Sequence, residues 1–464
     1  MNAPFLWIII PTFVSIFLLT IRNSRIRIIG YVASSAVFVL LTLIINISQI
    51  GDENLLPFEI SSSLNMLGRS FVLREEDKLL VQIIFIINTL WGIAIFVFNK
   101  KSLIIPFGFV FSGFILAAVS VDPFLYSALI IEIAVILSIP LIVGKLKNKN
   151  TGIIRYLIYQ TLAMPFILLA GWFLAGGEII PVTQEQLIQA SLLLGLGFVF
   201  WLAIFPFHSW VPMVFEESDP INSGYILIIL QTFSFIIINK YISGFAWLRN
   251  FAVFFQAFRF LGIIMVVYGA VGYFFQKKVL KMIGYELLYS TGVILIAIGF
   301  SNTRGIGLFT SLIGSRLFAF PMLIWSTSYL GKKVDNISLI NSGEIVKKEP
   351  ITGTLFIYSL LSLAGMPLTI GFPPLQTMYQ YLAMDYVYIL ILLLIGTGLK
   401  TIMVFKFIRN ILKTEIRLRN LLVINRENIF LFSCLILLII VGLFPKVALE
   451  PFINLSQSSE MLLK

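Results

Sequence analysis

Long apolar runs recur along the whole chain, and they limit its fold more than any other feature. A helix needs about 20 apolar residues to cross a bilayer, and the 464 residues contain about 14 such runs. The sequence is 59% hydrophobic and only 12% charged, a composition that excludes a soluble protein. We therefore expect an all-α polytopic membrane protein with about 14 transmembrane helices.

Two of these runs contain prolines that a straight helix does not accommodate. The four prolines are Pro206 and Pro212 in the span 187–214, and Pro367 and Pro373 in the span 351–383. Proline removes a backbone N–H and clashes with the preceding turn, so each span should break. Broken backbone at membrane depth is tolerated where it is buried in protein or lines a hydrated cavity. Paired breaks in two halves of one chain predict an inverted-repeat fold with a pathway at the breaks.

The spans divide the chain into four segments. We predict helices 1–3 in residues 1–101, a first five-helix repeat (helices 4–8) in 102–240, a second (helices 9–13) in 241–410, and a C-terminal helix 14 in 411–464.

The basic residues indicate the orientation of the chain. Of the 33 Lys and Arg residues, 22 fall in loops on one side of these spans and nine on the other. Basic loops stay in the cytoplasm, so we expect both termini outside. The first apolar run has no basic region before it and no small-residue cleavage site after it, which favours a retained span over a signal peptide.

The sequence lacks the usual signatures of an enzyme. It contains no Gly-rich phosphate loop, no metal-ligand cluster and no nucleophile–base constellation with plausible spacing. Cys434 is the only cysteine, so no internal disulfide forms. We expect no catalytic, cofactor or metal site within the chain, and no nucleic-acid partner. The alternating stretch Phe58 to Leu73, with Gly68, predicts either an exposed hairpin against a neighbour or a loop.

Three motifs are similar to those of one family. Pro206 to Pro212 (PFHSWVP) resembles the PFHxWLP signature of the antiporter-like membrane subunits of respiratory complex I, related hydrogenases and multisubunit cation/proton antiporters. Ser362 to Phe372 (SLAGMPLTIGF) is similar to the family's SLAGIPMTLGF, and Lys281 to Tyr285 resembles its KRMLAYSS helix start. The resemblance implies a 14-helix subunit that moves protons beside a redox partner.

The resemblance also shows departures at the family's proton-carrying lysines. These lysines fall here at Trp201, Gln231, Leu375 and near Ala319, and Gln231 is kept as a candidate of the proton pathway. The family's carboxylate on helix 5 is retained as Glu132. Glu132 is therefore the strongest candidate for a proton or ion station, with a neutral or paired buried carboxyl as the alternative.

Further ionisable residues within the spans are functional candidates, because burying a lone charge is expensive. Arg316 either replaces the missing lysine near Ala319 or pairs with Glu286. Lys400 either joins the path or extends its side chain to the cytoplasmic face. His208, the only histidine, either titrates near neutral pH or holds backbone carbonyls at the break.

Glu132 and Glu286 are predicted counterparts in the two halves. Each lies about 12–15 Å from an opposite face at ~1.5 Å per residue, as an inverted repeat would place equivalent groups. Each buried carboxylate then needs a cation partner or a water path, and Arg316 is the partner expected for Glu286.

These features predict a membrane subunit of a complex I-like redox-driven proton pump, with other membrane subunits and the lipid bilayer as its partners. We expect a multi-pass protein of a prokaryotic cell membrane. Three alternatives remain: a non-conducting scaffold of such a complex, a subunit of a cation/proton antiporter or membrane-bound hydrogenase, and a stand-alone transporter.

Overall fold

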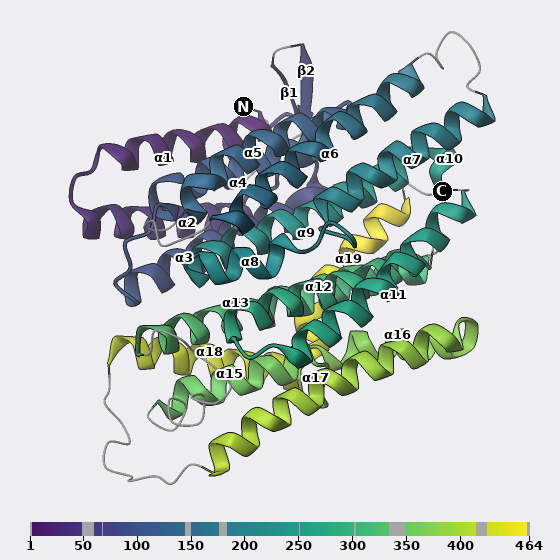
Figure 1. The fold of residues 1–464 in the computed structure, drawn as a ribbon. Coiled ribbons are helices and arrows are strands. Elements are labelled where there is room, and N and C mark those ends of the chain that lie inside the picture. Colours follow the sequence, from purple (N-terminus) through teal and green to yellow (C-terminus); the bar gives the residue numbers. More distant parts are fainter. Residues whose placement is uncertain are drawn as a thin grey trace. The chain divides into compact units, whose positions relative to one another are not determined.

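The computed structural model describes residues 2–48, 60–66, 68–143, 150–175, 183–249, 251–300, 303–333, 349–413 and 425–461. Helices account for most of these residues (Figure 1). In the described part of the chain, nine helices are long and apolar enough to cross a membrane, and four shorter apolar helices accompany them. The expectation of an all-α polytopic membrane protein is confirmed.

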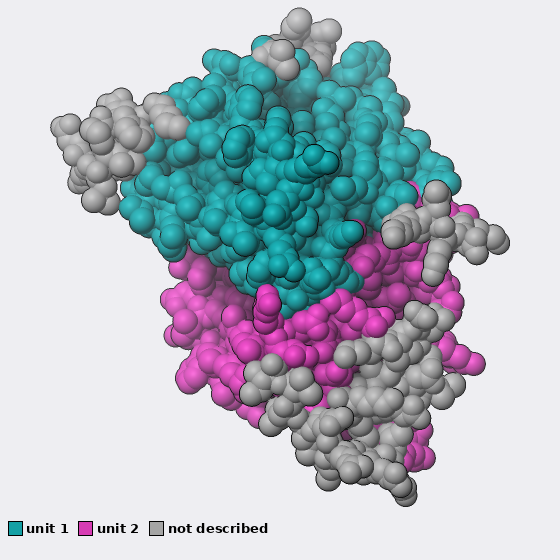
Figure 2. Space-filling model, turned by 90° about the vertical axis from the view of Figure 1, so that its left-hand side faces the viewer, with its two compact units in different colours: residues 1–146, 154–202, 225–250 teal, residues 147–153, 203–224, 251–464 magenta. Residues whose placement is uncertain are grey.

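The chain forms two compact units, coloured separately in Figure 2. Unit 1 comprises Met1–Leu146, Ile154–Leu202 and Tyr225–Asn250, and unit 2 comprises Lys147–Ile153, Ala203–Gly224 and Phe251–Lys464. The chain thus passes into unit 2 at Ala203, immediately after the first half of the first broken span.

Unit 1 holds the N-terminal helices and a small sheet. Its elements are η1 (Phe5–Ile9), α1 (Ile10–Thr20), α2 (Ser24–Ile44), β1 (Ser63–Met66), β2 (Arg69–Val72), η2 (Glu75–Asp77), α3 (Lys78–Val97), α4 (Ile104–Ser120), β3 (Val121–Asp122), η3 (Phe124–Tyr126), α5 (Ser127–Ile142), most of α6 (Thr151–Ala175), α7 (Gln184–Trp201), most of α9 (Pro220–Gly244) and α10 (Ala246–Arg249). Strands β1 and β2 form an antiparallel hairpin, with Met66 opposite Arg69 and with Gly68 at φ +72°; β3 pairs with β2. A hairpin within this stretch is therefore confirmed, whereas its packing against a neighbour stays a prediction.

A buried polar network joins four helices of unit 1. The Asn88 side chain on α3 accepts hydrogen bonds from Tyr31 on α2 at 2.5 Å and from Tyr225 on α9 at 2.7 Å. It also donates to Ser112 on α4 at 3.2 Å. A Cβ at Gly108 would lie 2.1 Å from the Tyr31 hydroxyl, so glycine is required for this close approach. Since hydrogen bonds between helices replace unsatisfied polar groups in the apolar core, this network fixes the packing of unit 1.

Unit 2 holds the second half of the chain and one short helix from the first. Its elements are α8 (Trp210–Glu217), α11 (Ala252–Phe275), α12 (Val279–Ile298), α13 (Thr303–Lys333), α15 (Pro350–Leu363), α16 (Phe372–Asp385), α17 (Val387–Lys413), α18 (Arg426–Leu443) and α19 (Pro445–Met461). Helix α12 packs against α8, α11 and α13 (Figure 1). The segment 411–464, expected to hold one helix, holds two; α19 packs on α13, where Phe452 contacts Gly314.

Both predicted helix breaks are present. Leu202 to Ser209 separates α7 from α8, and Ala364 to Gly371 separates α15 from α16. Pro206 and Pro367 lie inside these non-helical stretches. Pro212 and Pro373 do not interrupt a helix, contrary to expectation. They lie in the first turns of α8 and α16, where the missing N–H has no intrahelical partner to lose.

Candidate functional site

Glu286 on α12 and Lys400 on α17 form an ion pair in the interior of unit 2. The distance from Lys400 Nζ to Glu286 Oε1 is 2.7 Å, and each side chain is 1% exposed. The ammonium also lies 3.9 Å from the centre of the Tyr289 ring. Of the two alternatives for Lys400, extension of its side chain to the cytoplasmic face is therefore wrong. Lys400 is thus an ion-pair partner of Glu286, a role that the sequence had suggested for Arg316.

The second helix break completes the environment of Lys400. The last carbonyls of a helix have no intrahelical donor, and they carry the negative end of the helix dipole. Lys400 Nζ donates to the carbonyl oxygen of Leu363, the last residue of α15, at 2.7 Å. The lysine therefore binds a carboxylate on one helix and the exposed end of another.

Two glycines allow the chain to turn at this break. Gly365 has φ +69°, a conformation that favours glycine. A Cβ at Gly371 would lie 2.0 Å from the carbonyl oxygen of Ser362, so any side chain there would push the backbone apart. Glycine at these two positions keeps the ends of α15 and α16 close together, beside the ion pair.

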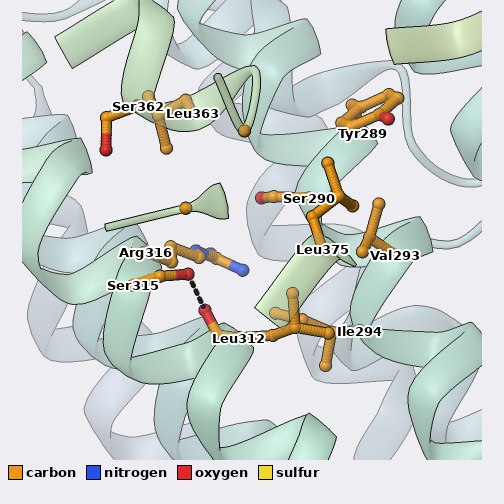
Figure 3. A pocket seen from close by; sticks show the side chains of 12 residues that line it. Tyr289, Ser290, Val293, Ile294, Leu312, Ser315, Arg316, Ser362, Leu363 and Leu375 are labelled. Carbon is orange, nitrogen blue, oxygen red and sulfur yellow. Dashed lines mark hydrogen bonds between the residues drawn. The ribbon is translucent and has the colours of Figure 1, made fainter. Parts of the chain in front are cut away.

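A small cavity of about 50 Å³ lies next to this break (Figure 3). It is lined by residues of α12, α13, α15 and α16 and of the break itself. Arg316 extends its guanidinium group into it, although the side chain is only 3% exposed. Arg316 also acts electrostatically on Glu286. The structure thus places Glu286, Arg316 and Lys400 around one break.

The first break places His208 among aromatic side chains. His208 is 5% exposed. Its ring lies 4.1 Å from the Tyr268 ring in an edge arrangement and stacks on Phe205 at 5.5 Å. Its two nitrogens make no hydrogen bond with the described residues. The interpretation that His208 holds backbone carbonyls is therefore not supported.

Gln160 on α6 binds the end of α7 instead. Its Nε2 donates to the carbonyl oxygens of Phe200 at 3.3 Å and Trp201 at 3.1 Å. A side chain thus caps the first half of each broken span, Gln160 in unit 1 and Lys400 in unit 2. Gln160 was missed from the sequence, although a glutamine within an apolar run was an available signal.

The two remaining candidates lie in unit 1. Gln231 is completely buried within α9. Glu132 is only half-buried, on the outward side of α5, and has no ion pair or hydrogen bond among the described residues. It is the sixth residue of α5, whereas Glu286 is the eighth of α12, so their Cα atoms lie about 8 and 11 Å along their helices. Different burial and depth do not support their pairing as counterparts.

Comparison with known proteins identifies the family. Residues 122–400 match the family described as NADH:quinone oxidoreductase/Mrp antiporter, TM. The chain belongs to this family. The matched region includes both helix breaks, Glu132 and the Glu286–Lys400 pair, so the family resemblance noted from the motifs is confirmed.

Individual relatives agree with this assignment. NAD(P)H-quinone oxidoreductase chain 4 from the chloroplast of Chlorokybus atmophyticus is 26% identical over 338 residues, which cover 66% of this chain and 64% of that protein. The match thus spans a little under two thirds of this relative's length.

Two solved structures share the fold over nearly the whole chain. A chain of respiratory complex I from Thermus thermophilus has a TM-score of 0.79 at 16% identity, covering 99% of this chain and 100% of that chain. A chain of the Mrp complex from Dietzia sp. has a TM-score of 0.80 at 11% identity, covering 100% and 99%. Both belong to complexes of several subunits.

Proposed function

We propose that the chain is a proton-translocating membrane subunit of a complex I-like redox-driven pump. The observation that carries this proposal is the Glu286–Lys400 ion pair, buried in an apolar helical unit. Ionisable groups inside a membrane are expensive and mark ion or proton pathways. The names of the quinone oxidoreductase relatives supply the coupled redox reaction. In this proposal the subunit holds no redox centre of its own.

The pair has the properties of a proton station. A carboxylate and an ammonium in contact can both be neutralised by transfer of one proton, whereas a guanidinium keeps its charge. The Leu363 carbonyl holds Lys400 at the break, so a change at the break alters the strength of the pair. We assign the pair the role that the family's lysines have elsewhere, because Trp201, Leu375 and Ala319 cannot bind a proton.

Glu132 supports the proposal that other membrane subunits cover α5. Its neighbours Ile133 and Ile136 are 44% and 53% exposed, so this side of the helix faces lipid or another chain. A carboxylate facing hydrocarbon costs about 2.5–3.5 kcal/mol or more. A polar or cationic partner in a neighbouring subunit removes that cost. We assign the complex to a prokaryotic cell membrane, although a chloroplast relative exists.

The test is proton translocation by the purified complex in liposomes, measured with a pH-sensitive dye and normalised to redox turnover. Glu286→Gln and Lys400→Met should each reduce translocation at least tenfold. Lys406→Met is the matched control: Lys406 lies on the same helix, with its ammonium 3.8 Å from the centre of the Phe274 ring, and should translocate normally. If both pair variants translocate like the parent, the pair is not a station.

The second candidate function is a non-conducting scaffold of the same complex. The specific observation in its favour is the set of apolar or neutral residues where the family carries lysine: Trp201, Gln231, Ala319 and Leu375. The same experiment separates the two functions. If the subunit is a scaffold, the complex with a pair variant stays assembled and translocates protons like the parent.

A further inference from the structure

Tyr289 on α12 contacts the Glu286–Lys400 pair through its aromatic ring. The Lys400 ammonium lies over this ring, 3.9 Å from its centre. The face of an aromatic ring carries partial negative charge, so it attracts a cation above it, most strongly where water is excluded. Tyr289 is 2% exposed and Lys400 is 1% exposed. The ring is therefore a partner of the ammonium beside the Glu286 carboxylate and the Leu363 carbonyl.

Two glycines leave room for the Tyr289 side chain in this position. A Cβ at Gly396 would lie 3.2 Å from Cε2 of the ring, and a Cβ at Gly269 would lie 2.7 Å from the backbone nitrogen of Tyr289. Gly396 precedes Lys400 by one turn on α17, so the two share a helix face. The lack of a side chain at Gly396 thus lets the ring lie directly beside the turn that carries the lysine.

The ring of Tyr289, and not its hydroxyl, makes the contact with the pair. The hydroxyl makes no hydrogen bond with the described residues, and a buried polar group without a partner costs free energy. Glu286 lies three residues before Tyr289, on the same face of α12. One turn of α12 therefore presents a carboxylate and an aromatic face to the same ammonium.

The partners of Lys400 respond differently to a proton. When Glu286 binds a proton, it loses its charge and with it the ionic attraction to Lys400. The aromatic ring and the Leu363 carbonyl attract the ammonium in either state of Glu286. We propose that Tyr289 is a positioning residue of the proton station, whose ring keeps the Lys400 ammonium at the helix break while Glu286 is protonated. This inference rests on the proposed function.

Proton translocation by the intact complex in liposomes, normalised to redox turnover, tests this role. Tyr289→Phe keeps the ring and removes the hydroxyl, so translocation should stay within about twofold of the parent. Tyr289→Leu keeps an apolar side chain without an aromatic face, and translocation should fall roughly tenfold. If Tyr289→Leu does not assemble, Tyr289→Met takes its place, because methionine fills irregular space in a core.

Phe407→Leu is the matched control. Phe407 lies on the same helix as Lys400, is 1% exposed and contacts the Phe356 ring at a centre-to-centre distance of 5.6 Å. The variant therefore removes an equally buried ring that packs against another ring. It should translocate protons like the parent.

The apparent melting temperature of the complex measures the contact without translocation. Tyr289→Leu should lower it more in the parent than in the double variant Glu286→Gln/Lys400→Met, which has no ammonium for the ring to attract. The loss of side-chain volume is the same in both backgrounds, so the difference between them reports the coupling of the ring to the pair.

Translocation by Tyr289→Leu equal to that of the parent overturns the inference, and so does translocation by Tyr289→Phe as low as that of Tyr289→Leu. An equal loss of melting temperature in the two backgrounds also overturns it. The pair variants separate this inference from the proposed function. If Glu286→Gln and Lys400→Met translocate like the parent, both fail; if they do not, a normal Tyr289→Leu variant overturns this inference alone.

Discussion

Removing one member of the Glu286–Lys400 pair should destabilise the subunit more than removing both. Each side chain is 1% exposed, so either one left alone is a buried charge without its partner. Breaking a buried ion pair in this way costs about 3–5 kcal/mol, whereas neutral replacement of both members is often nearly neutral. The double variant Glu286→Gln/Lys400→Met still leaves the Leu363 carbonyl without its donor, at about 1–3 kcal/mol. The double variant should therefore be more stable than Glu286→Gln by roughly 2 kcal/mol. It should be more stable than Lys400→Met by roughly 4 kcal/mol, because that single variant loses the donor to Leu363 as well as the pair.

The assay is the apparent melting temperature of the purified complex. It is measured as the fraction of the subunit that stays in the complex after heating. The expected order is parent, then the double variant, then both single variants. Lys406→Met controls for loss of a lysine on the same helix. If the double variant loses as much stability as the two single variants together, the residues act independently and the reasoning from the buried pair is refuted.

Three further predictions concern other parts of the chain. Glu132→Gln should lower proton translocation by the intact complex without loss of assembly, and translocation equal to that of the parent would remove Glu132 from the pathway. Gly371→Ala should lower the melting temperature, because the added Cβ would lie 2.0 Å from the Ser362 carbonyl oxygen. Gly398→Ala should not lower it, because no atom lies within 4 Å of the added Cβ and alanine favours a helix over glycine by about 1 kcal/mol. In a chain with Cys434 replaced, the Lys413→Cys variant should react with an impermeant thiol reagent only from the cytoplasmic side. Labelling from outside would show that the predicted orientation is wrong.

The sequence predicted the helices well because their signal is local. An apolar run of about 20 residues has few alternatives to a membrane helix, so the spans could be placed from the positions of these runs alone. Proline acts on its own backbone, which made both breaks predictable at Pro206 and Pro367. The same rule wrongly placed Pro212 and Pro373 inside the breaks. The sequence does not show where the next helix begins, and these two prolines lie in its first turn.

The partners of the buried charges were not predictable in this way. Lys400 is 114 residues from Glu286, and the sequence left open whether it joins the path or reaches the cytoplasmic face. Arg316 was the partner expected for Glu286. Hydropathy records that a charge lies in an apolar span but contains no information on which neighbouring helix it faces. Gln160 was missed for the same reason, since its role depends on the position of the α7 C-terminus.

The sequence by itself therefore determined the class of protein, its two broken spans and its family, since apolar length, proline chemistry and short motifs are properties of consecutive residues. Only the tertiary structure decided that Lys400 binds both Glu286 and the end of α15, that Arg316 extends into a cavity, and that Glu132 lies on an outward face. The physical reason is that helix packing brings together side chains from distant parts of the chain, and burial then makes the charge of each depend on the others.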